Sequence, residues 1–169
     1  MNIIDKVAVT SRSFSTNKIL VSELSKRYKH ITLNLTGKTL QNSQLVDFLK
    51  DKTKVIVGLE NFDKNLIEKL PKIQVISKFG VGLNNIDLES LTNNSIALGF
   101  EPWTNKQSVA ELALFHIIMS LRKIPSSKEE IISKKGNQNK GNELYQNTVG
   151  IVGFGNIGQK LAELLTPFN

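Results

Sequence analysis

Two glycine-rich segments have the residue types and spacing that could do chemistry. The first, GFGNIG at residues 153–158, follows the apolar run 149–152 and opens a segment with helical spacing. A dinucleotide site in this context needs Gly153 for a tight turn, Gly155 so that the backbone can approach a pyrophosphate, and Gly158 for close helix packing. The alternative is a tight structural turn that binds nothing.

The second segment, SKFGVGLNNID at residues 77–87, follows a predicted strand at 73–77. Ligands of open α/β sheets bind at the carboxyl ends of the strands, and glycines there expose backbone amides that can bind a carboxylate. A glycine turn that only redirects the chain is an equally good interpretation. Asn84, Asn85 and Asp87 are turn residues under either interpretation.

The composition predicts an ordinary folded protein. Of the 169 residues, 40% are hydrophobic and 22% are charged, as in globular proteins, and the length allows one domain plus the beginning of another. Because the sequence has no cysteine, it excludes a disulfide, a thiolate metal site and a cysteine nucleophile. With only His30 and His116 as imidazole ligands, we expect no protein-borne metal site.

Charge and hydropathy give expectations about partners and location. The net charge is +7, but the lysines are scattered from Lys6 to Lys160 without interleaved aromatic residues, so we expect no nucleic-acid partner. No run approaches the roughly 20 apolar residues that span a bilayer, and the start lacks the pattern of a signal peptide. We therefore expect a cytoplasmic protein without a membrane partner.

Short β-branched runs alternate with helical patterns through the first hundred residues. The apolar residues between these runs recur three and four apart, as on one face of a helix. Such alternation predicts an α/β domain with a parallel sheet and helices on both of its faces. The predicted strands are at residues 6–10, 31–35, 54–59, 73–77 and 95–100.

After the fifth predicted strand the sequence changes character. Residues 101–105, EPWTN, predict a turn-rich connector, and residues 108–124 are apolar on nearly every side, which predicts a buried helix. Ser108 and Glu111 have the spacing of a capping box. For His116, inside this helix, a buried core position is favoured over a catalytic role.

Polar residues also mark helix starts and a loop. The run KKGNQNKGN at residues 134–142 predicts a loop, and the apolar run 149–152 predicts a strand. The candidate helix caps are Ser15, Thr16 and Asn17 for the first helix, and Asn61 and Asp63 for the helix before Pro71.

Three successive segments carry a family resemblance: SKFGVGLNNIDLESL, NKQSVAELAL and GNELYQNTVGIVGFGNIGQKLAELL. In their order, spacing and residue types they resemble the D-isomer-specific 2-hydroxyacid dehydrogenases, a family that includes phosphoglycerate, D-lactate, glyoxylate and formate dehydrogenases. The resemblance covers nearly the whole chain and is most specific from Val75 to Leu165. The chain is therefore identified as phosphoglycerate dehydrogenase-like.

The resemblance implies a fold and a domain organisation. A flavodoxin-like parallel-sheet substrate domain is expected at residues 1–102. Residues 103–169 are then expected to hold a crossing helix and the first β-α unit of a Rossmann NAD-binding domain, which the end at Asn169 truncates. In the family, the crossing helix is part of a homodimer.

The resemblance also implies roles for particular residues. Backbone amides at Val81 and Gly82 would hold the carboxylate of a small 2-hydroxy or 2-oxo acid substrate. Asn105 would lie near the substrate and the nicotinamide, and Val109 would pack near the nicotinamide ring.

On the cofactor side, the amides of Asn156 and Ile157 would meet the pyrophosphate, beside Gly153, Gly155 and Gly158. The expected cofactor is NAD, and NADP stays open. The acidic residue that would hold the ribose is expected about 20 residues after the glycines, beyond the end of this sequence.

The family transfers hydride between nicotinamide and C2 of a D-2-hydroxy acid, with the help of an arginine, a glutamate and a histidine. All three lie downstream of the glycine segment in the family, so we expect no catalytic residue here and no activity from this chain alone. Leu112 stands where the family usually has a histidine. The alternative is a standalone flavodoxin-like binding or interaction module. A response-regulator receiver is disfavoured because residues 10–13, TSRS, contain no acidic residue.

Overall fold

The computed structural model describes residues 2–133 and 140–168, with only the backbone for residues 2 and 3. The chain divides into two units, Met1–Pro102 and Trp103–Asn169, which are described separately below. Most of the loop predicted at 134–142 lies outside the described residues. Among the residues described, no helix is long and apolar enough to cross a membrane.

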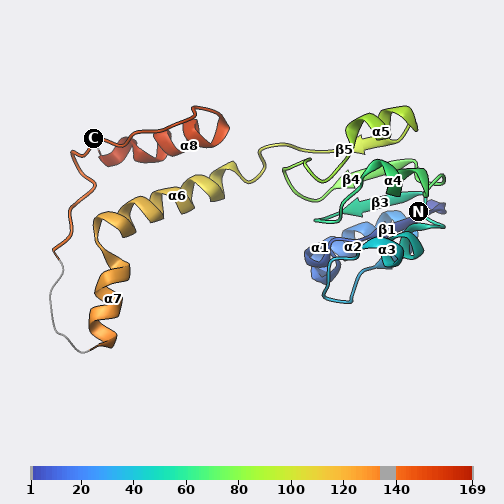
Figure 1. The fold of residues 1–169 in the computed structure, drawn as a ribbon, viewed down its shortest axis with the longest axis horizontal. Coiled ribbons are helices and arrows are strands. Elements are labelled where there is room, and N and C mark those ends of the chain that lie inside the picture. The colour runs from blue at the N-terminus through green and yellow to red at the C-terminus, as the bar shows by residue number, and fades with distance from the viewer. Residues whose placement is uncertain (1, 134–139, 169) are drawn as a thin grey trace. The chain divides into compact units, whose positions relative to one another are not determined.

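The first unit is a five-stranded parallel sheet with five short helices (Figure 1). The strands lie in the order β2-β1-β3-β4-β5, so the chain steps to one side of β1 first and then to the other. This is the flavodoxin-like order, with its switch point between β1 and β3. The predicted α/β class is confirmed. The elements are β1 (Asn2–Val9), α1 (Arg12–Thr16), α2 (Lys18–Arg27), β2 (Tyr28–Leu33), α3 (Asn42–Leu49), β3 (Lys54–Val57), α4 (Lys64–Glu68), β4 (Val75–Lys78), α5 (Leu88–Asn93) and β5 (Ala97–Gly99).

The core of this unit forms where the strands meet the helices. Val55, Val57 and Ile76 point from β3 and β4 into a cluster that also contains Leu49 of α3 and Phe62, all nearly inaccessible to water. In β1 the consecutive residues Val7, Ala8 and Val9 are all buried, so both faces of this strand are covered and its sequence is a continuous apolar run. The sheet is thus a rigid base for the loops at its carboxyl ends.

Side-chain caps fix where the helices begin. Asn17 Oδ1 accepts hydrogen bonds from the amides of Ile19 and Leu20 at 3.0 and 3.1 Å. Asp63 Oδ1 accepts from the Leu66 amide at 2.9 Å. These two caps confirm candidates from the sequence, because each satisfies amides of a first helical turn that have no partner within the helix.

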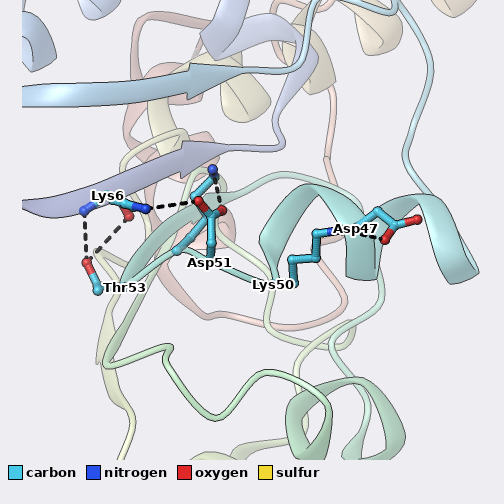
Figure 2. A network of polar contacts seen from close by, with 6 residues as sticks. Lys6, Asp47, Lys50, Asp51 and Thr53 are labelled. Atoms are coloured by element: carbon cyan, nitrogen blue, oxygen red, sulfur yellow. Dashed lines mark hydrogen bonds and ion pairs between the residues drawn. The ribbon is translucent and has the colours of Figure 1, made fainter.

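A polar network joins β1 to the turn between α3 and β3 (Figure 2). The Lys6 amide donates to Thr53 Oγ1 at 3.1 Å, and the Lys6 ammonium lies 3.2 Å from Asp51 Oδ2. Lys52 donates to the other oxygen, Asp51 Oδ1, at 2.6 Å. Lys50 pairs instead with Asp47 at 3.2 Å.

The network lowers the pKa of Asp51 to about 2, mainly through the hydrogen bond from Lys52; burial opposes this effect, and Lys6 lowers the pKa further. Since the pKa falls from 3.8 on folding, the pair stabilises the protein above pH 3.8. That stabilisation is lost as the pH falls toward about 2. It is small, because the Asp51 side chain is 44% exposed and water screens the charges.

We predict that Lys52→Met raises the pKa of Asp51 from about 2 part of the way toward 3.8, because Lys6 still contacts the carboxylate. Carboxyl-detected NMR titration of the purified chain measures this pKa. Lys50→Met is the matched control and is expected to leave Asp51 unchanged, because Lys50 pairs with Asp47. An Asp51 that titrates near 3.8 in the unaltered chain would contradict the network.

The second unit is helical and contains α6 (Lys106–Leu121), α7 (Ile124–Ile132), α8 (Asn156–Leu165) and the 3₁₀ turn Thr166–Phe168. Helix α6 packs against α8 (Figure 1). The sequence predicted one helix over 108–124, but the chain breaks at Lys123, whose φ is +53°, and Pro125 follows in the first turn of α7. Proline suits that position because its missing N–H is not needed in a first turn.

The prediction that the helix at 108–124 is buried is wrong for the described residues. Leu112, Phe115 and Ile118 are exposed, and Ala110 is the buried residue of α6. Helix α8 covers one side of α6, whereas an all-round apolar helix needs neighbours on every side. His116 is also exposed, so its predicted core position is wrong; its ring lies edge-on to that of Phe115 at 5.4 Å.

Two further local predictions are wrong. In place of a capping box, Ser108 Oγ donates to the Asn105 carbonyl at 2.9 Å and Glu111 accepts from the side chain of Gln107. Residues 149–152 form no strand with any described residue, and Val152 is fully exposed. A strand is defined by pairing with a neighbour, so an apolar run alone does not make one.

Candidate functional site

The loop that follows β4 presents two free backbone amides. Gly80 has a φ of +146°, a conformation that essentially only glycine adopts. Among the described residues, the N–H groups of Val81 and Gly82 have no hydrogen-bond partner. A Cβ built at Gly82 would meet nothing within 4 Å, so no other residue packs against this side of Gly82. The two predicted carboxylate-binding residues are thus neighbours in this loop, and their amides are not used by the described residues.

Asn85 holds this loop on the end of β3. Its Nδ2 donates to the carbonyls of Glu60 at 2.6 Å and Gly58 at 3.3 Å. Its Oδ1 accepts from the Lys78 ammonium at 2.7 Å, and its carbonyl accepts from the Phe62 amide at 2.8 Å. The sequence indicated only a turn at Asn85, because partners more than twenty residues away leave no local signal.

Lys78 completes the same junction. Its ammonium also donates to the Gly58 carbonyl at 2.5 Å, so it spans β3 and β4. Burial lowers the pKa of Lys78, and the negative charge of Glu60 partly opposes this effect. The cost of burying the ammonium is offset by its hydrogen bonds to two oxygens, so Lys78 positions the loop.

Glu60 is a buried carboxylate that joins β3 to β1. Its side chain is 2% exposed, and Oε2 accepts from Thr10 Oγ1 at 2.7 Å and from the Gly58 amide at 3.1 Å. Asn34, also buried, donates to the carbonyls of Thr10 and Lys38, both at 2.9 Å. The loops after β1, β2 and β3 are thereby joined through buried polar groups. Neither Glu60 nor Asn34 was predicted from the sequence.

A groove of about 480 Å³ lies over the β1/β3 switch point and reaches Phe79, the first residue of the loop after β4. The Phe79 ring stands edge-on to that of Phe14 at 5.2 Å. A larger depression of about 650 Å³ lies between α3 and α4. We place the site at the smaller groove, because ligands of parallel sheets bind outside the strand ends at the switch point. The groove is lined chiefly by Ser11, Arg12, Ser13, Gly58, Glu60 and Phe79.

In the second unit, the predicted glycine turn directly precedes α8. Gly153 has a φ of +91°, and a Cβ at Gly158 would lie 2.4 Å from the Gly153 carbonyl oxygen, so both positions require glycine. Gly155 is the N-cap of α8 and has open space in front of it. The amides of Asn156 and Ile157 have no partner among the described residues, as is usual in a first helical turn.

The remaining predicted site residues lie at the start of α6. Asn105 is the N-cap of this helix, and its carbonyl accepts from the half-buried Val109 at 3.1 Å. The structure thus brings Val81 and Gly82 together in the first unit, and places the other predicted residues at the starts of two helices in the second.

Comparison with known proteins identifies the family. The family model for the D-isomer specific 2-hydroxyacid dehydrogenase, catalytic domain, matches residues 7–160. This chain belongs to that family. The resemblance noted in the sequence is therefore confirmed.

Two curated relatives of this chain have the names of enzymes. It is 33% identical over 134 residues to the D-3-phosphoglycerate dehydrogenase of Methanocaldococcus jannaschii, covering 76% of this chain and 25% of that one. It is 29% identical over 139 residues to the hydroxypyruvate reductase of Thermotoga maritima, covering 80% and 45%. The chain thus spans between a quarter and a half of the length of these relatives.

Solved structures show the same fold. The NAD-dependent formate dehydrogenase of Staphylococcus aureus, in complex with NAD, is 26% identical with a TM-score of 0.73, covering 100% of this chain and 54% of that one. D-2-hydroxyisocaproate dehydrogenase gives a TM-score of 0.79 at 22% identity, covering 99% and 51%.

We predict that Gly58→Ala destabilises the first unit by about 1 to 3 kcal/mol, the usual cost of overpacking. The new Cβ would lie 3.0 Å from the Cα of Ser11 and push the loop after β1 away from β3. Hydrogen exchange at the β3 amides measures this cost. Gly82→Ala is the control, expected to change stability by less than about 0.5 kcal/mol because its Cβ meets nothing. Equal effects of the two variants would contradict the close approach of β3 to Ser11.

Proposed function

We propose that this chain forms the substrate-binding unit and the first cofactor-binding elements of an NAD-dependent oxidoreductase. The enzyme transfers hydride between nicotinamide and C2 of a D-2-hydroxy acid, in the manner of a phosphoglycerate dehydrogenase. The observation that carries this proposal is the loop after β4. In it the amides of Val81 and Gly82, which have no partner among the described residues, follow Gly80, whose φ is positive. The family match over residues 7–160 supports it.

The substrate carboxylate is held by the amides of Val81 and Gly82. Two adjacent N–H groups without a partner among the described residues can both donate to one carboxylate, and Asn85 and Lys78 already hold the loop in place. Asn105, at the start of α6, is assigned to the side of the substrate nearest the nicotinamide. This last assignment follows from the family resemblance.

The glycine turn before α8 fits a dinucleotide. Gly155 leaves space for the pyrophosphate, and the amides of Asn156 and Ile157 point out of a helix N-terminus that has no side-chain cap. We assign the pyrophosphate to these amides and the nicotinamide ring to Val109. When bound, NAD supplies a nicotinamide that takes up or gives back a hydride; NADP is the alternative cofactor. For the full-length protein, the family implies a homodimer.

We propose further that these 169 residues alone do not catalyse turnover. Proton transfer at the substrate oxygen needs a titratable group within hydrogen-bond reach. In the first unit, His30 is exposed on the edge strand β2, three strand spacings from β4, or about 15 Å. His116 is an exposed residue of α6 in the second unit.

Amide-resolved NMR titration of the chain tests the proposal with two ligands. D-lactate is expected to shift the Val81 and Gly82 amides, because its carboxylate accepts from them. NAD is expected to shift Asn156 and Ile157. Binding of D-lactate without any effect of NAD would favour the alternative, a flavodoxin-like module that binds carboxylates without catalysis. Failure of both ligands at saturating concentration would overturn the proposal.

A matched pair of glycine variants makes the NAD arm specific. Gly155→Ala is expected to weaken NAD binding about tenfold or more, because the methyl group occupies the space of the pyrophosphate. Gly150→Ala is the control, because its Cβ also meets nothing in the protein and it lies outside the turn. An equal loss of NAD affinity in both variants would contradict the assignment of the pyrophosphate to the space beside Gly155.

We predict that the purified chain oxidises no NADH when mixed with glyoxylate, pyruvate or hydroxypyruvate, because His30 of the first unit lies about 15 Å from β4 and the Lys78 ammonium is already hydrogen-bonded to Gly58 and Asn85. Loss of absorbance of NADH over hours, compared with a sample lacking protein, is the measurement. Protein-dependent oxidation with any of these acids would contradict the proposal that these 169 residues do not catalyse turnover.

A further inference from the structure

The groove over the β1/β3 switch point contains a buried carboxylate with one uncommitted oxygen. Glu60 is 2% exposed, and both hydrogen bonds to its side chain go to Oε2. Oε1 has no partner among the described residues. Oε1 is not among the fully covered side-chain oxygens that lack a partner in the described residues, so it keeps some access to solvent. Glu60 lines this groove and also the depression between α3 and α4.

Arg12 lines the same groove and carries the opposite charge. Its Nη1 donates to the Gly37 carbonyl at 3.3 Å, and no ion pair within the described chain involves its guanidinium. A guanidinium only donates hydrogen bonds, and a carboxylate only accepts them. The groove therefore offers one donor-only group and one acceptor-only group to whatever enters it.

This pair selects among ligand groups. A cation in the groove would be repelled by Arg12, and an anion would be repelled by Glu60. A hydroxyl group both donates and accepts, so it can satisfy Glu60 Oε1 and the free N–H groups of Arg12 together. Ser11 and Ser13 add two further hydroxyls. The exposed side chain of Leu59, 71% accessible, offers apolar surface to a carbon chain.

The groove is close to the carboxylate loop within the same unit. Phe79 lines the groove and lies two residues before Val81. Strands β3 and β4 are hydrogen-bonded neighbours, so the loop after β4 and the groove over β1 and β3 are one to two strand spacings apart, about 5 to 10 Å. A ligand held by its carboxylate at the loop can therefore extend a tail into the groove.

We propose that this groove binds the hydroxylated tail of the substrate, which is a 2-hydroxy or 2-oxo acid with several further hydroxyl groups. Glu60 accepts a hydrogen bond from a tail hydroxyl, and Arg12 donates one. The inference rests on the proposed function, in which the substrate carboxylate binds at Val81 and Gly82. It adds a class of substrate to that function.

NMR titration of the chain with D-gluconate and D-lactate tests the inference, since both carry the 2-hydroxy acid but only gluconate has a polyol tail. D-gluconate is expected to bind about tenfold more tightly and to shift the amides of Ser11 and Gly58 as well as those of the loop. D-lactate is expected to shift only the loop.

Glu60→Gln converts the free acceptor into a donor. The Gly58 amide can only donate, so it fixes the glutamine oxygen in place of Oε2 and turns the NH₂ group toward the groove. The gluconate affinity is expected to fall to that of lactate, whose affinity does not change. Glu68→Gln, an exposed residue of α4, is the matched control and is expected to keep the full preference. If Glu60→Gln does not fold, Arg12→Gln, on an exposed side chain, is expected to reduce the preference for gluconate at least threefold.

The outcomes separate the two proposals. Equal affinity for gluconate and lactate, or a preference for gluconate that survives both Glu60→Gln and Arg12→Gln, overturns the tail site and leaves the carboxylate loop standing. If lactate fails to shift Val81 and Gly82, the proposed function fails by itself. The tail site then fails as a substrate subsite as well, whatever gluconate does at Ser11 and Gly58.

Discussion

The carboxylate of Glu60 is buried between β1 and β3, and the arrangement of the candidate site depends on it. One of its oxygens binds both the Thr10 hydroxyl and the Gly58 amide, so it joins the ends of two neighbouring strands. The Glu60 backbone then accepts from Asn85, which carries the loop after β4. A buried charge is costly unless it is hydrogen-bonded, and here the same bonds that offset the cost also hold the loops after β1 and β3 together.

The parallel sheet explains why these groups meet. All five strands run in one direction, so the loops after β1, β3 and β4 leave from the same edge. The order reverses at β1 and β3, and the connecting segments diverge there and leave a groove. Close approach is possible because Gly58 has no side chain to meet Ser11. The geometry of the candidate site therefore follows from strand order and one glycine, with polar side chains to hold the loops.

Much of the fold could be predicted because its signals are local. Alternating apolar runs indicated the five strands, and Asn17 and Asp63 cap helices as their position before apolar segments suggests. The need for glycine at positions 153 and 158 also follows from a short motif. The position and type of a strand, cap or required glycine were predictable wherever the residues involved interact with near neighbours in the sequence.

The rest depended on partners distant in sequence. Glu60 binds Thr10, fifty residues away, and no spacing rule links them. The apolar run 149–152 carries the pattern of a strand, but pattern does not supply a neighbouring strand. For α6, the all-round apolar pattern indicated burial, whereas Phe115 and His116 are exposed in the described chain. An apolar pattern indicates which residues of a segment can be buried, but it does not indicate which other segment will cover them.

A crystal structure of this chain grown in saturating D-lactate tests the central claim most directly. The account predicts lactate at the end of β4, with its carboxylate oxygens accepting from the amides of Val81 and Gly82 at about 2.7 to 3.2 Å. A loop that holds no lactate while a different surface of the first unit does would contradict it.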